Sequence, residues 1–154
     1  MFAYASRPET SRYTTWSPHT ERRDAEAFLG YALGERFCWA IRLDENGPAV
    51  GAVECTAEAP GENSIHYVLA PDHWGQGLMT EAARAVLGWA FENRPGVERI
   101  YTGAIESHAA SRRVLEKCGL KFVGTVSESW EKFTEPVTLA VYEVTRAAWG
   151  ASRS

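Results

Sequence analysis

The sequence predicts an α+β (α/β mixed) fold in which helices cover both faces of a mixed sheet. Three observations support this prediction: a β-hairpin pattern over residues 37–56, a strand–helix–strand–helix succession over 64–118, and two further strand patterns after it. An antiparallel beginning joined to a central strand–helix–strand unit is typical of such sheets. The length of 154 residues fits one domain, so we expect residues 1–154 to form a single domain.

The first third of the chain is predicted to contain one helix and one hairpin. In residues 20–33 the apolar side chains recur at helical spacing, and Gly34 follows as a C-cap. Residues 37–43 and 49–56 have strand patterns, and the turn-forming segment 44–48 separates them. We therefore expect an antiparallel hairpin, which Pro60-Gly61 ends.

The middle of the chain is predicted to continue with a strand and a long helix. Residues 64–69 are a short run of β-formers that Pro71 interrupts. Gly77 begins a helical stretch that reaches about Asn93, and Pro95-Gly96 ends it.

The last third is predicted as strand, helix and two strands. Residues 97–105 alternate as a strand does, and 109–118 have a helical pattern with Gly119 after it. Residues 120–126 and 138–146 are the last two strands, and residues 150–154 are expected to be a loose tail.

Composition excludes several classes of protein. A net charge of −4 and a pI near 5.6 argue against a protein that grips nucleic acid through phosphate contacts. Cys38, Cys55 and Cys118 are odd in number and lack metal-ligand spacing, so we expect no disulfide framework, no metal and a reducing cytoplasm. We also expect no membrane association, because no apolar run approaches ~18 residues and the N-terminus is polar.

The most informative segment is residues 69–81, which read LAPDHWGQGLMTE. A strand, a tight loop with Gly75 and Gly77, and a helix start follow one another there. Unpaired N–H groups at a helix N-terminus bind phosphate without a basic side chain, and glycines let a large anion approach the backbone. The segment is neither a Walker loop nor a GxGxxG fingerprint. A glycine pair that only shapes the turn is the alternative interpretation.

Two segments resemble one known family. Residues 69–83 resemble motif A of the GNAT acetyltransferase superfamily, in its RimJ/RimL-like branch, with a strand, Pro, a WGxG loop and a Thr-Glu-Ala helix start. Residues 108–120, HAASRRVLEKCGL, are similar to the family's Asn-x-x-Ser-x-x-x-Leu-Glu-Lys-x-Gly-Phe segment. The resemblance implies a GNAT-like fold, with a twisted, mostly antiparallel sheet of about six strands that splays between its two central strands.

The resemblance also implies acetyl-coenzyme A as cosubstrate, with no metal. The pantetheine arm is expected to lie along the strand that ends at Leu69, whose N–H is a candidate oxyanion donor, and to reach His108 and Ser111. The implied residues of the pyrophosphate loop are Trp74, Gly75, Gln76, Gly77, Leu78, Met79 and Thr80.

The sequence departs from the family at several places, among them Leu120 for the family's Phe, and three departures bear on the site. His108 stands where the family has Asn, and Leu115 stands where many members have the Tyr that protonates the thiolate. The family's first strand and part of its first helix are apparently missing. A lost edge strand, or one that another chain supplies, would leave pairing groups that favour a homodimer.

The implied reaction is direct attack of a primary amine on the thioester in a ternary complex. Ser111 is the candidate hydroxyl donor to sulfur, and its alternative role is to bond backbone in the first turn of its helix. The candidate general bases are Glu54, His66 and Glu106, each with a purely structural alternative.

Substrate basicity bears on the need for a base. An α-amine is neutral for about one molecule in ten at pH 7, whereas a lysine is neutral for only about one in 2,500. The absence of an obvious carboxylate base therefore favours an N-terminal α-amine or another weakly basic small amine. Trp16, His19 and Trp130 are candidate walls of the acceptor pocket, with core packing as their alternative role.

Two other functions stay open at this point. A coenzyme-binding sensor or assembly subunit without turnover would account for Leu115, His108 and the short N-terminus. A phosphate-binding regulator unrelated to coenzyme A is the third hypothesis.

Overall fold

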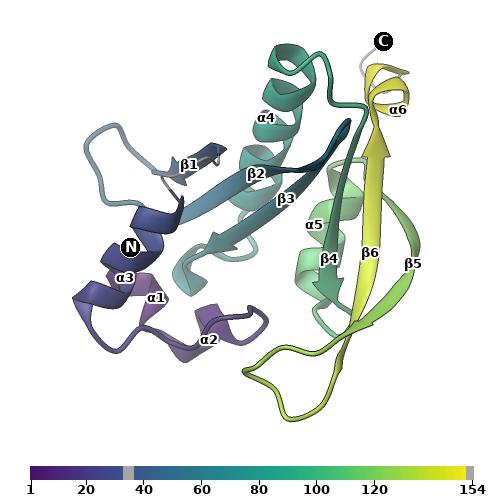
Figure 1. Ribbon diagram of the computed structural model, residues 1–154. Coiled ribbons are helices and arrows are strands. Elements are labelled where there is room, and N and C mark those ends of the chain that lie inside the picture. The colour runs from purple at the N-terminus through teal and green to yellow at the C-terminus, as the bar shows by residue number, and fades with distance from the viewer. Residues whose placement is uncertain (33–36, 152–154) are drawn as a thin grey trace.

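The structure is a computed structural model of the chain, and it describes residues 1–32 and 37–151 (Figure 1). Six strands form one sheet in the order β1-β2-β3-β4-β6-β5. Only the β3–β4 pair is parallel, and the other neighbours are antiparallel. The predicted mixed, mostly antiparallel α+β sheet is therefore confirmed. The strands are β1 (Phe37–Ile41), β2 (Gly51–Ala59), β3 (Glu62–Leu69), β4 (Arg99–Ile105), β5 (Lys121–Glu128) and β6 (Val137–Thr145).

Helices precede, interrupt and follow these strands. Within the described ranges, no helix is both long and apolar enough to cross a membrane. The helices are α1 (Phe2–Ala5), α2 (Pro8–Ser11), α3 (Arg22–Ala32), the 3-10 turn η1 (Pro71–His73), α4 (Leu78–Asn93), α5 (Ala109–Lys117) and α6 (Arg146–Ala151).

Helices lie on both faces of the sheet. On one face, Trp89 of α4 packs against Phe37 and Trp39 of β1, with ring centroids 4.8 and 4.7 Å apart. Cys38 points to the other face because successive strand residues alternate. There it lies near Tyr4 of α1, whose pKa is raised to about 12 by burial first and by Cys38 second.

The two central strands separate after a short paired stretch. Residues 62–64 of β3 pair with residues 99–101 of β4, and the later residues of both strands are unpaired with each other. Figure 1 shows the two strands diverging toward the end where η1 and the β5–β6 loop lie. The predicted splay is confirmed, and we call the space between residues 65–69 and 102–105 the wedge.

The core explains why the strands hold this arrangement. Fully buried side chains from three strands, including Val53, Ile65 and Ile100, meet Leu87 of α4 and Leu115 of α5. Burying an aliphatic side chain of this size contributes about 1.5–3 kcal/mol. The sheet, α4 and α5 are thereby fixed around the wedge.

The structure also corrects the prediction in places. Pro60-Gly61 is the turn that joins β2 to β3, so these strands form a second hairpin. Gly150 and Ala151 belong to α6, so the expected loose tail was wrong for them. Gly34 and residues 152–154 lie outside the described residues. Before β1, the described part of the chain contains helices and turns and no strand.

Candidate functional site

The loop between β3 and α4 has the backbone that the sequence predicted. Gly75 and Gly77 have φ angles of +76° and +84°, in the left-handed region that favours glycine. Gly77 is the N-cap of α4, and the first helical bond runs from the N–H of Glu81 to the carbonyl of Gly77. The sequence folds this way because two left-handed positions, on either side of Gln76, turn the chain sharply before the helical pattern starts.

This loop leaves a set of donors open. No side chain caps α4, and the first amides of a helix have no carbonyl one turn earlier to bond. A Cβ atom added at Gly75 or Gly77 would meet nothing within 4 Å, so the space in front of both glycines is clear. The helix dipole adds partial positive charge at the same place. The backbone here therefore fits a phosphate group.

Two basic residues, Arg84 and Lys117, border the same place together with the acidic Glu81. A cavity beside the loop is lined by Gly77, Thr80, Glu81, Arg84 and Lys117. The guanidinium of Arg84 donates to the carbonyl oxygen of Lys117 over 2.5 Å and so joins α4 to the end of α5. Sequence reasoning missed both cations. Arg84 lies two helical turns from Gly77 and so shares its face, a signal the sequence contained, whereas Lys117 comes from another helix.

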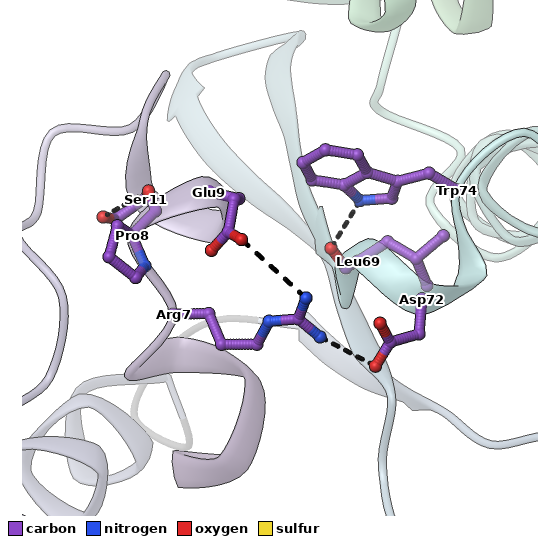
Figure 2. A network of polar contacts seen from close by, with 7 residues as sticks. All are labelled: Arg7, Pro8, Glu9, Ser11, Leu69, Asp72 and Trp74. Atoms are coloured by element: carbon purple, nitrogen blue, oxygen red, sulfur yellow. Dashed lines mark hydrogen bonds and ion pairs between the residues drawn. The ribbon is translucent and has the colours of Figure 1, made fainter.

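Leu69 turns its backbone toward the wedge. The N–H of Ala70 donates to the carbonyl of Val50, beside β2, over 2.7 Å. Because alternate residues of a strand bond to opposite sides, the N–H and C=O of Leu69 point away from β2. The carbonyl accepts the indole N–H of Trp74 over 2.8 Å (Figure 2). The Leu69 N–H thus points away from β2, toward the wedge.

A hydroxyl pair connects β3, which borders the wedge, with α5. The phenolic oxygen of Tyr67 in β3 lies 2.9 Å from Oγ and 3.2 Å from the carbonyl oxygen of Ser111 in α5. Burial raises the pKa of Tyr67 strongly, so this phenol stays protonated. Sequence reasoning named Ser111 and missed Tyr67. Its position two residues before Leu69, and hence on the same strand face, was the available signal.

His108 and Leu115, both in the segment that resembles the family, have different surroundings. His108 is the N-cap of α5, and its ring stacks on Tyr13 with centroids 4.0 Å apart. Burial lowers the pKa of His108, which favours a neutral imidazole at pH 7. Leu115 is only 1% exposed and packs in the core. The place where the family's Tyr would stand is thus a packing position here.

Two of the three candidate bases lie together. Glu54 and His66 are directly opposite each other in the β2–β3 register, on the sheet face that Tyr67 does not occupy. His66 Nε2 lies 3.0 Å from Ser64 Oγ, which donates to Glu58 over 2.5 Å. The structure therefore gives His66 a chain of polar neighbours on β2 and β3.

The third candidate base follows β4. The N–H of Glu106 donates to the carbonyl of Thr138 over 2.9 Å, and the guanidinium of Arg112 donates to the carbonyl of Glu106 over 3.1 Å. Glu106 is therefore held at the open end of the wedge rather than beside His66.

The predicted acceptor residues lie on two segments that one lysine joins. Trp16 and His19 are neighbours, with ring centroids 5.2 Å apart, and Trp130 lies in the β5–β6 loop. Lys132 in this loop donates through Nζ to the carbonyls of Ser11, Thr14 and Trp16, the last over 3.2 Å. Sequence reasoning missed Lys132. The structure thus holds the loop with Trp130 against the segment that leads to Trp16.

An ion pair ties the N-terminal segment to the loop between β3 and α4. Arg7 Nη1 donates to a carboxylate oxygen of Asp72 in η1 over 2.7 Å, as Figure 2 shows. This contact lowers the pKa of Asp72. Among residues 1–32 and 37–151, no three His, Cys, Asp or Glu side chains gather as a metal site would require.

Known proteins share both sequence and fold with this chain. Residues 1–121 match a family model described as an acetyltransferase (GNAT) domain. The uncharacterized protein YkkB of Bacillus subtilis is 29% identical over 135 residues, which are 88% of this chain and 70% of that protein. The FsC-acetyl coenzyme A-N(2)-transacetylase of Aspergillus fumigatus is 32% identical over 126 residues, which are 79% of this chain and 51% of that protein.

Solved structures have the same fold. An acetyltransferase of the GNAT family from Bacillus anthracis superposes with a TM-score of 0.85 at 22% identity, over 96% of this chain and 87% of that one. The aminoglycoside acetyltransferase AAC(6')-Ib in complex with coenzyme A has a TM-score of 0.80 at 24% identity, over 99% and 91%. Spermidine N-acetyltransferase from Vibrio cholerae, with CoA and spermine, has a TM-score of 0.78 at 14% identity, over 96% and 89%.

Proposed function

Because this chain belongs to the GNAT acetyltransferase family and is therefore an acyltransferase, we propose that it transfers the acetyl group of acetyl-coenzyme A to a primary amine. The observation that carries the proposal is the open N-terminus of α4. There, exposed amides around two left-handed glycines, Gly75 and Gly77, lie next to the cationic side chains of Arg84 and Lys117.

This arrangement suits the polyanionic end of coenzyme A. The loop amides would hold the pyrophosphate, and Arg84 and Lys117 would pair with phosphate oxygens at its border. Charge-assisted hydrogen bonds of this kind are about twice as strong as neutral ones. The pantetheine arm would then follow β3 into the wedge, where the N–H of Leu69 points.

The residues at the wedge would supply orientation and electrostatic stabilisation. A thioester is already activated toward amines, so the chain has to place the amine, stabilise the oxyanion and assist the leaving sulfur. The Leu69 N–H and the Ser111 hydroxyl are the donors that we assign to the last two tasks. Glu54 and His66, side by side on β2 and β3, are the candidate acceptors for the proton of the amine, directly or through water.

The proposed acceptor is a weakly basic primary amine, such as an N-terminal α-amine or a small amine. The relatives named for aminoglycoside and spermidine acetylation act on amines, and the fold shared with them supports this choice of class. Trp16, His19 and Trp130 would form the pocket wall, and Lys132 would hold its two halves together. We further propose that residues 1–154 act as one acetyltransferase domain of the RimJ/RimL-like branch.

The test is a thiol-release assay with the full chain, acetyl-coenzyme A and a panel of peptides and small amines. We expect saturable release of coenzyme A thiol and an acetylated product by mass spectrometry. Arg84→Gln and Lys117→Gln should each weaken acetyl-coenzyme A binding by about tenfold, because a charged hydrogen bond is worth about 1.5–3 kcal/mol. Arg113→Gln, an exposed cation on α5, is the matched control and should bind normally.

Two results would contradict the proposal. Tight coenzyme binding without thiol release across the panel would favour a non-catalytic coenzyme-binding subunit. If calorimetry detects no binding of acetyl-coenzyme A, the assignment of the loop around Gly75 and Gly77 as the pyrophosphate site is wrong as well.

A further inference from the structure

The contact between Tyr67 and Ser111 joins β3, one side of the wedge, to α5, the helix that follows β4. The residues are 44 positions apart in sequence, one in β3 and one in the first turn of α5. Both side chains are partly buried. Tyr67 shares its strand face with Leu69, whose backbone points into the wedge.

The number of hydroxyl hydrogens limits the hydrogen bonds that Tyr67 and Ser111 can make. A serine hydroxyl has one hydrogen to donate and can accept two hydrogen bonds. In the first turn of a helix, a free serine commonly spends its hydrogen on nearby backbone. The single hydrogen of the Tyr67 phenol has two acceptors within reach, Oγ and the carbonyl oxygen of Ser111, and Oγ is the nearer. Where the phenol donates to Oγ, the Ser111 hydrogen must point away from the phenol. The serine is then left with a proton for a third partner.

The phenol is a suitable permanent donor. Desolvation raises the pKa of Tyr67, so the phenol does not ionise at neutral pH. It therefore keeps its hydrogen and does not become a phenolate that would only accept hydrogen bonds. The same shift makes Tyr67 a poor acid. A role through Ser111 is therefore more consistent with the chemistry than direct proton transfer from the phenol.

We propose that Tyr67 is a positioning residue, which orients the Ser111 hydroxyl toward the sulfur of the acyl donor through the 2.9 Å contact between the two side-chain oxygens. This inference rests on the proposed acetyltransferase function. The hydroxyl groups of Tyr67 and Ser111 would together replace the donor that is missing at Leu115, whose side chain has no hydrogen-bond donor and packs in the core.

The amine nitrogen forms a bond to the acetyl carbon, the carbon–sulfur bond breaks, and its electron pair stays on sulfur. The Ser111 O–H stabilises the developing thiolate by a hydrogen bond. The proton that the nitrogen loses passes to the proposed acceptors, Glu54 and His66, directly or through water. An equivalent proton reaches the sulfur from water, so neither Ser111 nor Tyr67 changes its protonation state over the cycle.

The experiment is a double-mutant cycle with Tyr67→Phe, Ser111→Ala and the double variant. Phe keeps the ring and removes only the hydroxyl. We expect each single variant to lower kcat by about tenfold, with KM for acetyl-coenzyme A and the Kd of coenzyme A by calorimetry within twofold of wild type. The double variant should be no slower than Ser111→Ala, because Tyr67 acts through Ser111. Tyr101→Phe in β4 is the matched control and should keep the wild-type kcat.

Other outcomes overturn the inference. Multiplicative losses in the double variant would mean that the two hydroxyls act independently. A rise in KM and Kd without a change in kcat would mean that the contact only holds β3 and α5 together. If the wild-type protein turns over and Tyr67→Phe has the same kcat, the positioning role alone is overturned. If the wild-type protein acetylates no amine, the proposed function and this inference are overturned together.

Discussion

The indole N–H of Trp74 donates a hydrogen bond to the carbonyl oxygen of Leu69 over 2.8 Å, across the loop that leads from β3 to α4. The bond fixes the loop against the last residue of the strand (Figure 2). It also occupies the carbonyl of Leu69 and leaves the N–H of the same residue directed at the wedge. One side chain thus holds together the proposed phosphate-binding loop and the proposed oxyanion donor.

Trp74→Phe should weaken acetyl-coenzyme A binding by about fivefold. The variant keeps an aromatic ring and loses the N–H, so the loop is no longer tied to Leu69, and a neutral hydrogen bond contributes about 0.5–1.5 kcal/mol. Titration calorimetry measures the change. Trp149→Phe, at α6, is the control, and equal affinities for both variants would contradict this role of Trp74.

Gly77→Ala should affect both the fold and the ligand. Its φ of +84° costs an alanine about 1–2 kcal/mol in free energy of unfolding, although no neighbouring atom blocks the added Cβ. The same Cβ would stand in front of the amides, so KM for acetyl-coenzyme A should rise at least tenfold. Gly96→Ala, which has no positive φ and no close neighbour, is the control in denaturant unfolding and in the assay. A stable Gly77→Ala protein with normal KM would be inconsistent with the phosphate loop.

Lys132→Met should act on the acceptor and not on the coenzyme. Methionine keeps the length of the side chain but leaves three carbonyls, those of Ser11, Thr14 and Trp16, without the ammonium donor. The β5–β6 loop would then move relative to the segment before Trp16. We expect KM for the amine to rise by about tenfold while the Kd of acetyl-coenzyme A stays unchanged. Lys121→Met, on the exposed side of β5, should leave both constants at wild-type values.

The Arg7–Asp72 pair predicts a pH dependence with a defined sign. The folded-state pKa of Asp72 lies below its ordinary value of 3.8, chiefly because of the hydrogen bond from Arg7. A depressed pKa means that the contribution to stability is fully present above pH 3.8 and is lost as the pH falls through the lower folded value. NMR titration of the Asp72 carboxyl should show the depression, and Arg7→Gln should return the pKa to its ordinary range. An unchanged pKa in Arg7→Gln would contradict the assignment to Arg7.

The loop could be predicted from the sequence because its determinants are local. Gly75, Gly77 and the helical pattern that follows lie within a few residues, and the backbone conformation depends on them directly. The strands and long helices were predicted for the same reason. α1 and α2 were missed because four-residue helices are too short to show a periodic pattern.

The side-chain contacts of the site could not be predicted, because they join distant parts of the chain. Lys132 and Ser11 are 121 residues apart, and Tyr67 and Ser111 are 44 apart. Neither pair follows from spacing along one element. The cations of the cavity show the same difference: Arg84 shares a helix face with Gly77, whereas Lys117 reaches the cavity only through the packing of α5 against α4.

The central claim is that backbone amides at the start of α4 bind the pyrophosphate of coenzyme A. Amide NMR spectra of the full chain during a titration with coenzyme A test it most directly. We expect the largest shifts at the N–H groups of Gly77, Leu78, Met79 and Thr80, with inorganic pyrophosphate moving the same amides. If these four resonances do not shift at a saturating concentration of coenzyme A, the claim is contradicted.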